Sequence, residues 1–208
     1  ERMAVVGDQE VFYVLNLASL ECERVQYLGD GHAAGSIRAP VLSEGPYLIV
    51  CENQPAQNAS QLRIINAAQT SGELAEVQTA KIDGLVVDTP VVRGQDLFVP
   101  STGERVSAFT LSDTAGQPVL TVGPVFSGRT ESQYPIYLST GPERQVWLAS
   151  TSVRRLQVIG GELRPDQTQA AVGFTSQPLQ YVDRKLFNGR RRAFTDAVTV
   201  TRMDREQL

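Results

Sequence analysis

The sequence of 208 residues is poor in the side chains that build metal and catalytic sites. It has one histidine and two cysteines, whereas a zinc site takes four Cys/His ligands, or three protein ligands around an open position. These residues are scattered, which argues against a metal site made of His and Cys. Calcium binds carboxylates and carbonyls instead, but no Asp-x-Asp-x-Asp-Gly loop is present. We therefore expect no metal and no cofactor in this chain.

Cysteine is also too scarce to hold the fold together. Cys22 and Cys51 are the only two, and two thiols in a chain of this length are not a disulfide framework. We expect two half-buried strand cysteines rather than a single bridge between them.

Basic charge and long apolar runs are scarce as well. The formal net charge is −4, so no basic face is expected to neutralise phosphates, and we expect no nucleic-acid partner. No apolar run approaches the roughly 18–20 residues that span a bilayer, so we expect no direct membrane insertion. No signal peptide is visible, but the chain opens within a strand-like pattern, as an excised domain does. The absent targeting segment therefore says nothing about the parent protein.

What the sequence does have is a repeat. One pattern returns four times: small or polar residues, a proline, two or three apolar residues, a turn and a second apolar run. Successive prolines are separated by 50, 45 and 43 residues, and a period in the forties built from short strands is typical of β-propeller blades. Proline has no N–H to give to a ladder, so it suits the start of a strand, here the innermost strand. The four prolines are Pro40, Pro90, Pro135 and Pro178.

Each copy of the repeat continues with an alternating third strand, a glycine turn and a poorer fourth strand. In residues 105–111 the period of two separates a buried face from a wetter one. Glycine in the following turn supplies the positive φ of a tight hairpin. We therefore predict an all-β fold, a β-propeller of four-stranded antiparallel blades that bury their faces against one another. The alternative is a β-sandwich with coincidental spacing.

The predicted domain is a single propeller, or propeller fragment, over residues 1–208. Three full repeats are flanked by two partial ones, and both partial repeats carry their own second and third strands. We therefore expect a piece of a larger ring of about seven or eight blades. The predicted blades are 1–36 (partial), 37–84, 85–131, 132–174 and 175–208 (partial).

The repeats resemble the quinoprotein-type (pyrroloquinoline-quinone-like) propeller repeats. That family reads small-Pro-Val-Val, a turn, an apolar strand, Val-x-Ala-Leu-Asp, and a Thr-Gly-Glu turn leading to tryptophan. Residues 89–92, 97–99 and 106–109 match best, and residues 14–19 and 71–74 match as well. The resemblance covers nearly the whole chain and implies the propeller fold, but each motif is short.

The chain departs from the family in two respects, the tryptophan that locks the blades and the residues that the family's enzymes use. The family's tryptophan, four residues after the turn glycine, locks neighbouring blades by stacking, and here Arg24, Glu76, Leu120 and Pro165 hold those positions. The only tryptophan, Trp147, falls on a second strand, where we expect it in the core. The resemblance also implies that a quinone-dependent dehydrogenase needs an adjacent cysteine pair, a calcium site and an Asp base. The two cysteines here are not adjacent, so we predict that the chain is not an enzyme.

Three groups of residues are candidates for binding. Residues just before the prolines are expected to converge at the mouth of a central channel. His32 lies in a glycine-flanked connection between blades, where a lone histidine without a partner reads as a surface residue. An arginine run follows an Asn-Gly turn signal, so we expect it on an exposed hairpin end that could bind carboxylates or phosphates. Residues 52–61 read as a long polar loop. The candidates are Arg38, Asp88, Gln133, Tyr134 and Gln177 at the channel, with His32, Arg190, Arg191 and Arg192.

The function that these features favour is a non-catalytic scaffold or binding module. It would recognise protein or peptide partners through the propeller face and loops, and no particular small-molecule ligand is indicated. It resembles the non-catalytic outer-membrane-assembly-lipoprotein type of propeller, which implies a periplasmic or extracytoplasmic location. The alternative is a fragment of a quinoprotein-like oxidoreductase whose catalytic residues lie outside this chain.

Overall fold

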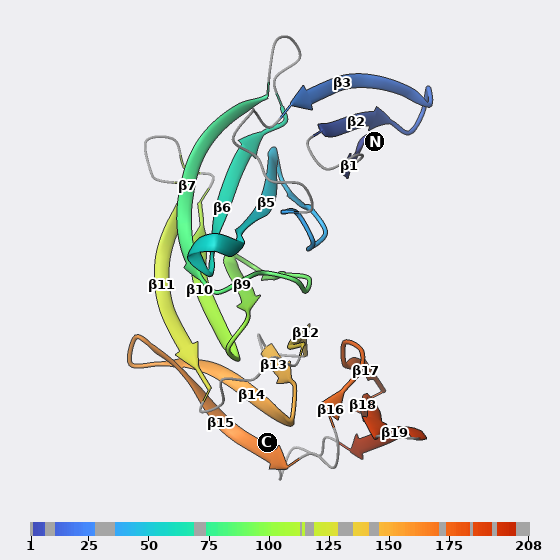
Figure 1. The fold of residues 1–208 in the computed structure, drawn as a ribbon, viewed down its shortest axis with the longest axis vertical. Helices are drawn as coiled ribbons and strands as arrows, with labels where there is room; N and C mark the ends of the chain where they lie inside the picture. Colours follow the sequence, from blue (N-terminus) through green and yellow to red (C-terminus); the bar gives the residue numbers. More distant parts are fainter. Residues whose placement is uncertain are drawn as a thin grey trace. The chain divides into compact units, whose positions relative to one another are not determined.

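The computed structural model describes residues 2–6, 11–27, 36–68, 74–112, 114, 119–128, 135–141, 146–170, 174–183, 185–192 and 195–202. In these ranges the regular structure is β, apart from one short 3-10 helix, Pro55–Gln57 (Figure 1). None of the helical structure in this part of the chain is long and apolar enough to cross a membrane.

The strands of the described ranges form five sheets, each built from consecutive strands (Figure 1). Sheet 1 has three strands and the other four have four each, as the predicted all-β fold of four-stranded antiparallel blades requires. Sheet 1 consists of β1 (Arg2–Val6), β2 (Val11–Asn16) and β3 (Glu21–Tyr27). Sheet 2 consists of β4 (Leu42–Glu44), β5 (Tyr47–Gln54), β6 (Ala59–Asn66) and β7 (Ala75–Asp83). Sheet 3 consists of β8 (Val91–Arg93), β9 (Asp96–Ser101), β10 (Arg105–Leu111) and β11 (Leu120–Ser127). Sheet 4 consists of β12 (Tyr137–Thr140), β13 (Val146–Ala149), β14 (Ser152–Ile159) and β15 (Glu162–Ala170). Sheet 5 consists of β16 (Phe174–Thr175), β17 (Gln180–Val182), β18 (Lys185–Arg192) and β19 (Thr195–Arg202).

Three of the recurring prolines lie where the sequence places them, just before a first strand, whereas Pro178 falls between two segments of one. β4, β8, β12 and β17 each begin one or two residues after a proline. In sheet 5 the effect of the proline is visible in the ladder, because β16 and β17 pair with the same edge of β18, on either side of Pro178. The missing N–H of proline thus divides a first strand into two short segments.

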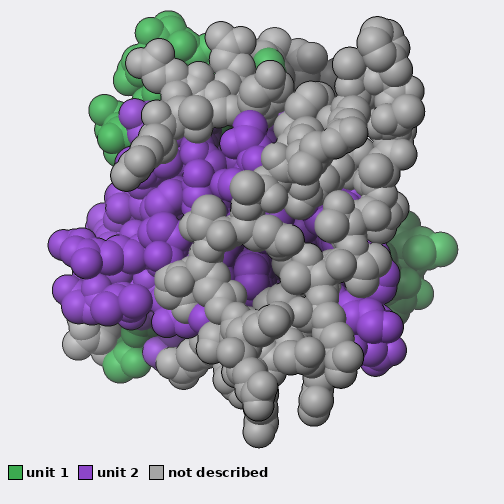
Figure 2. Space-filling view, turned by 90° about the horizontal axis from the view of Figure 1, so that it is seen from below, with its two compact units in different colours: residues 1–86, 112–120 green, residues 87–111, 121–208 purple. Residues whose placement is uncertain are grey.

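The chain divides into two compact units, coloured green and purple in Figure 2. Unit 1 consists of Glu1–Val86 and Ser112–Leu120, and unit 2 of Val87–Leu111 and Thr121–Leu208. In unit 1, sheets 1 and 2 share an apolar core. Its buried members are Val14, Leu48, Val50, Ile65 and Leu74.

In unit 2, both faces of sheet 4 contribute to apolar cores. One face joins sheet 3 in a core that includes Phe98, Phe126 and Leu148. The other face carries Trp147, which is 4% exposed and packs with Leu179, between β16 and β17 of sheet 5. All four residues of β13 are buried, because successive side chains point to opposite covered faces. The expectation that Trp147 belongs to the core is confirmed.

The two cysteines are free and lie on strands, as expected, but the expectation that both are half-buried is wrong. Cys22 is exposed on β3 and Cys51 is buried on β5. Burial raises the pKa of the Cys51 thiol to about 12, so it stays protonated near neutral pH and its sulfur is out of reach.

This difference predicts the outcome of thiol labelling. We expect a disulfide reagent at pH 8 to label one thiol, Cys22, in the native protein and both thiols in denaturant, because the thiolate is the nucleophile and only Cys22 is exposed. Mass spectrometry of the labelled peptides identifies the reacting residue. Rapid native labelling of Cys51 would contradict the buried placement of β5.

Candidate binding site at the first strands of unit 2

The structure describes three of the predicted channel residues. Arg38 is exposed and lies ahead of β4 in unit 1, whereas Asp88 and Gln177 lie in unit 2. That Arg38 converges with Asp88 therefore stays a prediction. Arg190, Arg191 and Arg192 end β18, with their side chains outside the described part of the structure, and His32, Gln133 and Tyr134 lie outside the described residues altogether.

Asp88 lies two residues before Pro90 and is half-buried. Its carboxylate accepts a hydrogen bond from the backbone N–H of Ile136, which directly precedes β12. Its Oδ2 atom is buried and has no hydrogen-bond partner among the described residues. Burial raises the pKa of Asp88 to about 6, and the bond from Ile136 opposes that rise. The first strand of sheet 4 is thus tied to the segment that leads into sheet 3.

Two hydroxyl groups on β12 continue this link toward sheet 5. Tyr137 Oη donates to the backbone oxygen of Ser176 over 3.2 Å, and Ser139 Oγ donates to that of Leu179 over 2.8 Å. Tyr137 and Ser139 are two residues apart on one strand and so point to the same side. Burial raises the pKa of Tyr137, and the negative charge of Asp88 raises it further.

Gln177 completes this set of polar groups. Its exposed side chain covers Gly189, since a Cβ built on Gly189 would lie 2.5 Å from Nε2 and 2.8 Å from Cδ of Gln177. Ser176 N–H also donates to the backbone oxygen of Gly189 over 3.0 Å. We call the resulting group, which comes from three successive repeats, the Asp88 cluster. Its members are Asp88, Tyr137, Ser139, Ser176 and Gln177.

The placement of Gly189 corrects one expectation from the sequence. Asn188 and Gly189 read as a turn, but both are buried residues within β18, whose ladder with β19 continues through them. The physical reason is the close approach of Gln177, which a side chain at position 189 would obstruct. The arginine run therefore lies within the paired strand β18, which ends at Arg192, and does not follow a turn at 188–189.

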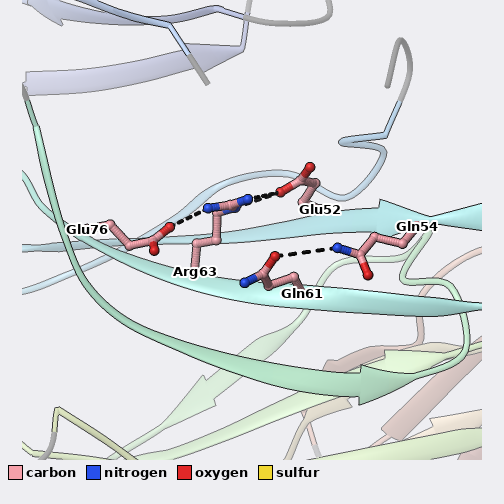
Figure 3. Close-up of polar contacts among 5 residues, drawn as sticks. All are labelled: Glu52, Gln54, Gln61, Arg63 and Glu76. Atoms are coloured by element: carbon pink, nitrogen blue, oxygen red, sulfur yellow. Dashed lines mark hydrogen bonds and ion pairs between the residues drawn. The ribbon is translucent and has the colours of Figure 1, made fainter. Parts of the chain in front are cut away.

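The segment 52–61 is a second correction, because it is not a long polar loop. β5 continues to Gln54 and β6 begins at Ala59, so only a four-residue connection remains. Its polar side chains are held across the strands: Arg63 lies between Glu52 and Glu76, with Nε 2.6 Å from Glu52 and Nη1 2.5 Å from Glu76 (Figure 3). These polar residues reflect cross-strand pairing rather than a binding loop.

A buried polar network on the same hairpin explains two more of those side chains. Asn53 Oδ1 accepts the N–H of Val86 over 2.7 Å, and Asn53 Nδ2 donates to the Val86 oxygen over 2.8 Å. Ser60 Oγ lies 2.7 Å from Asn53 Oδ1 and 2.8 Å from the backbone oxygen of Gly84. The hairpin of sheet 2 thereby holds the segment that follows β7, which is a structural role.

Sequence reasoning missed the most deeply buried charge of unit 2, Glu104. This residue is 0% exposed, accepts a hydrogen bond from Ser150 Oγ over 2.6 Å, and forms an ion pair with Arg154. Its backbone oxygen accepts the N–H of Gly128 over 2.9 Å. Residues 58, 104 and 150 are spaced 46 residues apart, close to the period of the repeat, and this spacing was a weak signal in the sequence. In the structure the backbone oxygen of each accepts an N–H from the segment that follows a fourth strand.

The chemistry that these groups offer is recognition rather than bond breaking. The Asp88 cluster combines a carboxylate, hydroxyls, an exposed carboxamide and backbone carbonyls, all of which form hydrogen bonds with polar groups. Within the described ranges, no three or more His, Cys, Asp or Glu residues group together in a way that could hold a metal ion.

Comparison with known proteins adds one structural likeness. No family model matches the sequence, and no curated protein matches it. The crystal structure of BamB from Moraxella catarrhalis is similar to this chain, with a TM-score of 0.63 and 12% sequence identity. The match covers 90% of this chain and 52% of that one, so the chain spans about half the length of that structure. At this identity the likeness shows the fold: four-stranded antiparallel blades of the β-propeller kind.

Proposed function

We propose that the chain is a non-catalytic binding module that recognises a protein or peptide partner through the Asp88 cluster of unit 2. The observation that carries the proposal is the convergence of polar groups from three successive repeats. Tyr137 connects the segment of Asp88 to that of Gln177, and the Gln177 side chain is exposed. Binding residues commonly lie on such connecting segments, held by a rigid scaffold.

Two further observations support a binding role over the oxidoreductase alternative. The cysteines stand on different strands, one exposed and one buried, so this chain does not itself supply the adjacent pair that quinone-dependent dehydrogenases of the resembled family need. The sequence resemblance to non-catalytic outer-membrane-assembly propellers and the structural likeness to BamB are both consistent with a partner-binding protein. From the sequence resemblance we also propose a location outside the cytoplasm, in the periplasm or an equivalent compartment.

The experiment compares variants of the cluster in partner capture. The wild-type chain and a Gln177→Ala variant are immobilised and exposed to an extracytoplasmic protein extract, and the retained proteins are identified by mass spectrometry. Gln57→Ala is the matched control, because Gln57 is an exposed glutamine on the 3-10 helix of unit 1. A protein retained by the wild type and by Gln57→Ala, but at least fivefold less by Gln177→Ala, supports the proposal.

Gly189→Ala extends the test without removing a side chain of the cluster. The added methyl group displaces Gln177, and because Gln177 is exposed and can swing away, we expect the fold to lose less than about 1 kcal/mol. Equal retention by all variants would overturn the assignment of the cluster. Pyrroloquinoline quinone with calcium provides the second arm: a stable bound chromophore in the absorbance spectrum would favour the oxidoreductase alternative.

A further inference from the structure

The Asp88 carboxylate connects sheets 3 and 4 of unit 2 through its hydrogen bond with the Ile136 N–H, apart from the contacts of Glu104 with Ser150 and Arg154. Asp88 belongs to the segment that leads into β8, and the Ile136 N–H that it accepts opens β12. β12 also lies against β8 and β9. The packing of sheet 3 on sheet 4 therefore includes one side chain whose charge depends on pH.

The surroundings of this carboxylate favour its neutral form. Oδ2 is buried without a hydrogen-bond partner among the described residues, and an ionised oxygen in that position loses its water without compensation. Among the described residues, Tyr137 on β12 is a titratable neighbour; it is neutral below pH 10 and offers no positive charge. No charged side chain of the described segments contributes to the perturbation of Asp88, which arises from burial and from the Ile136 bond.

We propose that Asp88 is a proton-operated contact between sheets 3 and 4: the protonated carboxyl stabilises the packing of β12 beside β8, and the ionised carboxylate loosens it. The direction follows from linkage. Burial raises the pKa of Asp88 from 3.8 to about 6 in the folded protein, so the folded state binds the proton more tightly than the unfolded state. The stabilisation is complete below about pH 4 and is lost as the pH rises through about 6.

The Asp88→Asn variant isolates the contribution of Asp88 to the pH dependence of stability from that of the other titratable groups. Asparagine is neutral at every pH, keeps an oxygen that can accept the Ile136 N–H, and resembles the protonated acid. Between pH 5 and pH 7.5 we expect the unfolding equilibrium constant of the wild type to rise about tenfold relative to that of Asp88→Asn. Urea unfolding followed by Trp147 fluorescence measures this ratio, and hydrogen exchange of the Ile136 N–H in both proteins measures the contact itself.

Three control variants test whether the effect belongs to Asp88. Asp183→Asn removes an exposed carboxylate of unit 2 and should leave the wild-type pH dependence intact. Arg129→Gln and Glu131→Gln remove the charges that precede β12 in the sequence and should also leave it intact. The proposal is wrong if any of the three control variants abolishes the pH dependence. It is also wrong if the unfolding equilibrium constants of the wild type and Asp88→Asn change in parallel from pH 5 to 7.5. Should Asp88→Asn fail to fold, a carboxyl titration of the wild type by NMR decides: a pKa near 4 for Asp88 overturns the proposal, and one near 6 upholds it.

Discussion

Replacing Glu104 by alanine is expected to lower the free energy of unfolding by about 3–5 kcal/mol, because it leaves a half-buried guanidinium without its counter-charge. The carboxylate of Glu104 is fully buried and binds both Ser150 and Arg154. The Arg154 guanidinium also lies over the ring of Phe126, 5.8 Å from its centroid. This group joins the hairpin of sheet 3 to the hairpin of sheet 4, so its loss affects both sheets.

The structure contains a matched control for this change. Glu162 and Arg164 form an ion pair of the same chemistry on β15, but both side chains are more than half exposed. Glu162→Ala should therefore change the stability by only about 0–1 kcal/mol. Urea unfolding of both variants, followed by circular dichroism and by Trp147 fluorescence, measures the difference. Similar small effects of Glu104→Ala and Glu162→Ala would show that the buried pair does not hold the sheets together.

Gly128 provides an independent check on the position of the Glu104 side chain. A Cβ on Gly128 would lie 2.6 Å from Cδ and 2.9 Å from Cβ of Glu104, and the buried glutamate has no exposed direction in which to move. Gly128→Ala should thus destabilise the wild type, and less so a chain that already carries Glu104→Ala, because that substitution removes Cδ although it keeps the Cβ of residue 104. Additive effects of the two substitutions would contradict the contact, since residues that touch are expected to be coupled.

The repeat made much of the fold predictable. Proline lacks an amide hydrogen whatever the tertiary context, so Pro40, Pro90, Pro135 and Pro178 mark strand starts by a local rule, and the strands begin where that rule places them. Period-two alternation is also local, and β10 occupies residues 105–111 as the pattern indicates. Blade boundaries at the level of single residues remain predictions.

The turn at Asn188 and Gly189 failed because its determinant is not local. Glycine is favoured by positive φ, but also by the close approach of another chain segment. Here the approaching group is the Gln177 side chain, twelve residues earlier in the sequence, and the pairing of β16 with β18 lies next to this contact. A local reading of Asn-Gly cannot contain that information.

The repeat pointed to two members of the candidate site, Asp88 and Gln177, but not to the contacts around them, and their role in binding stays a prediction. Residues preceding the prolines were expected to be functional, and Asp88 and Gln177 do belong to one unit. Tyr137 and Ser139 lie in the repeat between those of Asp88 and Gln177. They were missed because their hydroxyls bind backbone oxygens of another repeat, which no local pattern indicates. Glu104 was missed for the same reason, since Thr102-Gly103-Glu104 reads as an exposed turn until sheet 4 covers it.

Trp147→Ala is expected to cost about 3–5 kcal/mol of unfolding free energy, the usual range for truncating a large buried aromatic side chain. Trp147 is 4% exposed and packs with Ala149, Val153 and Leu179 on the face of sheet 4 that is turned away from the sheet 3 core. Its truncation leaves a cavity beside the segment that carries Gln177. The damage should therefore extend to the contacts of sheet 5.

Circular dichroism must follow the unfolding of this variant, since Trp147 is the only tryptophan and its removal abolishes the fluorescence signal. Val158→Ala on the neighbouring strand β14 is the control, because Val158 is 53% exposed and its truncation should cost less than about 0.5 kcal/mol. Trp147→Phe retains an aromatic ring, so its loss of unfolding free energy should lie between those of Trp147→Ala and Val158→Ala.

Hydrogen exchange locates the effect: in Trp147→Ala the amides of β17 and β18 should lose protection before those of β9 and β10, which pack on the opposite face of sheet 4. Uniform loss across sheets 3, 4 and 5 would mean that the two faces of sheet 4 do not act as separate cores and that unit 2 unfolds as one block.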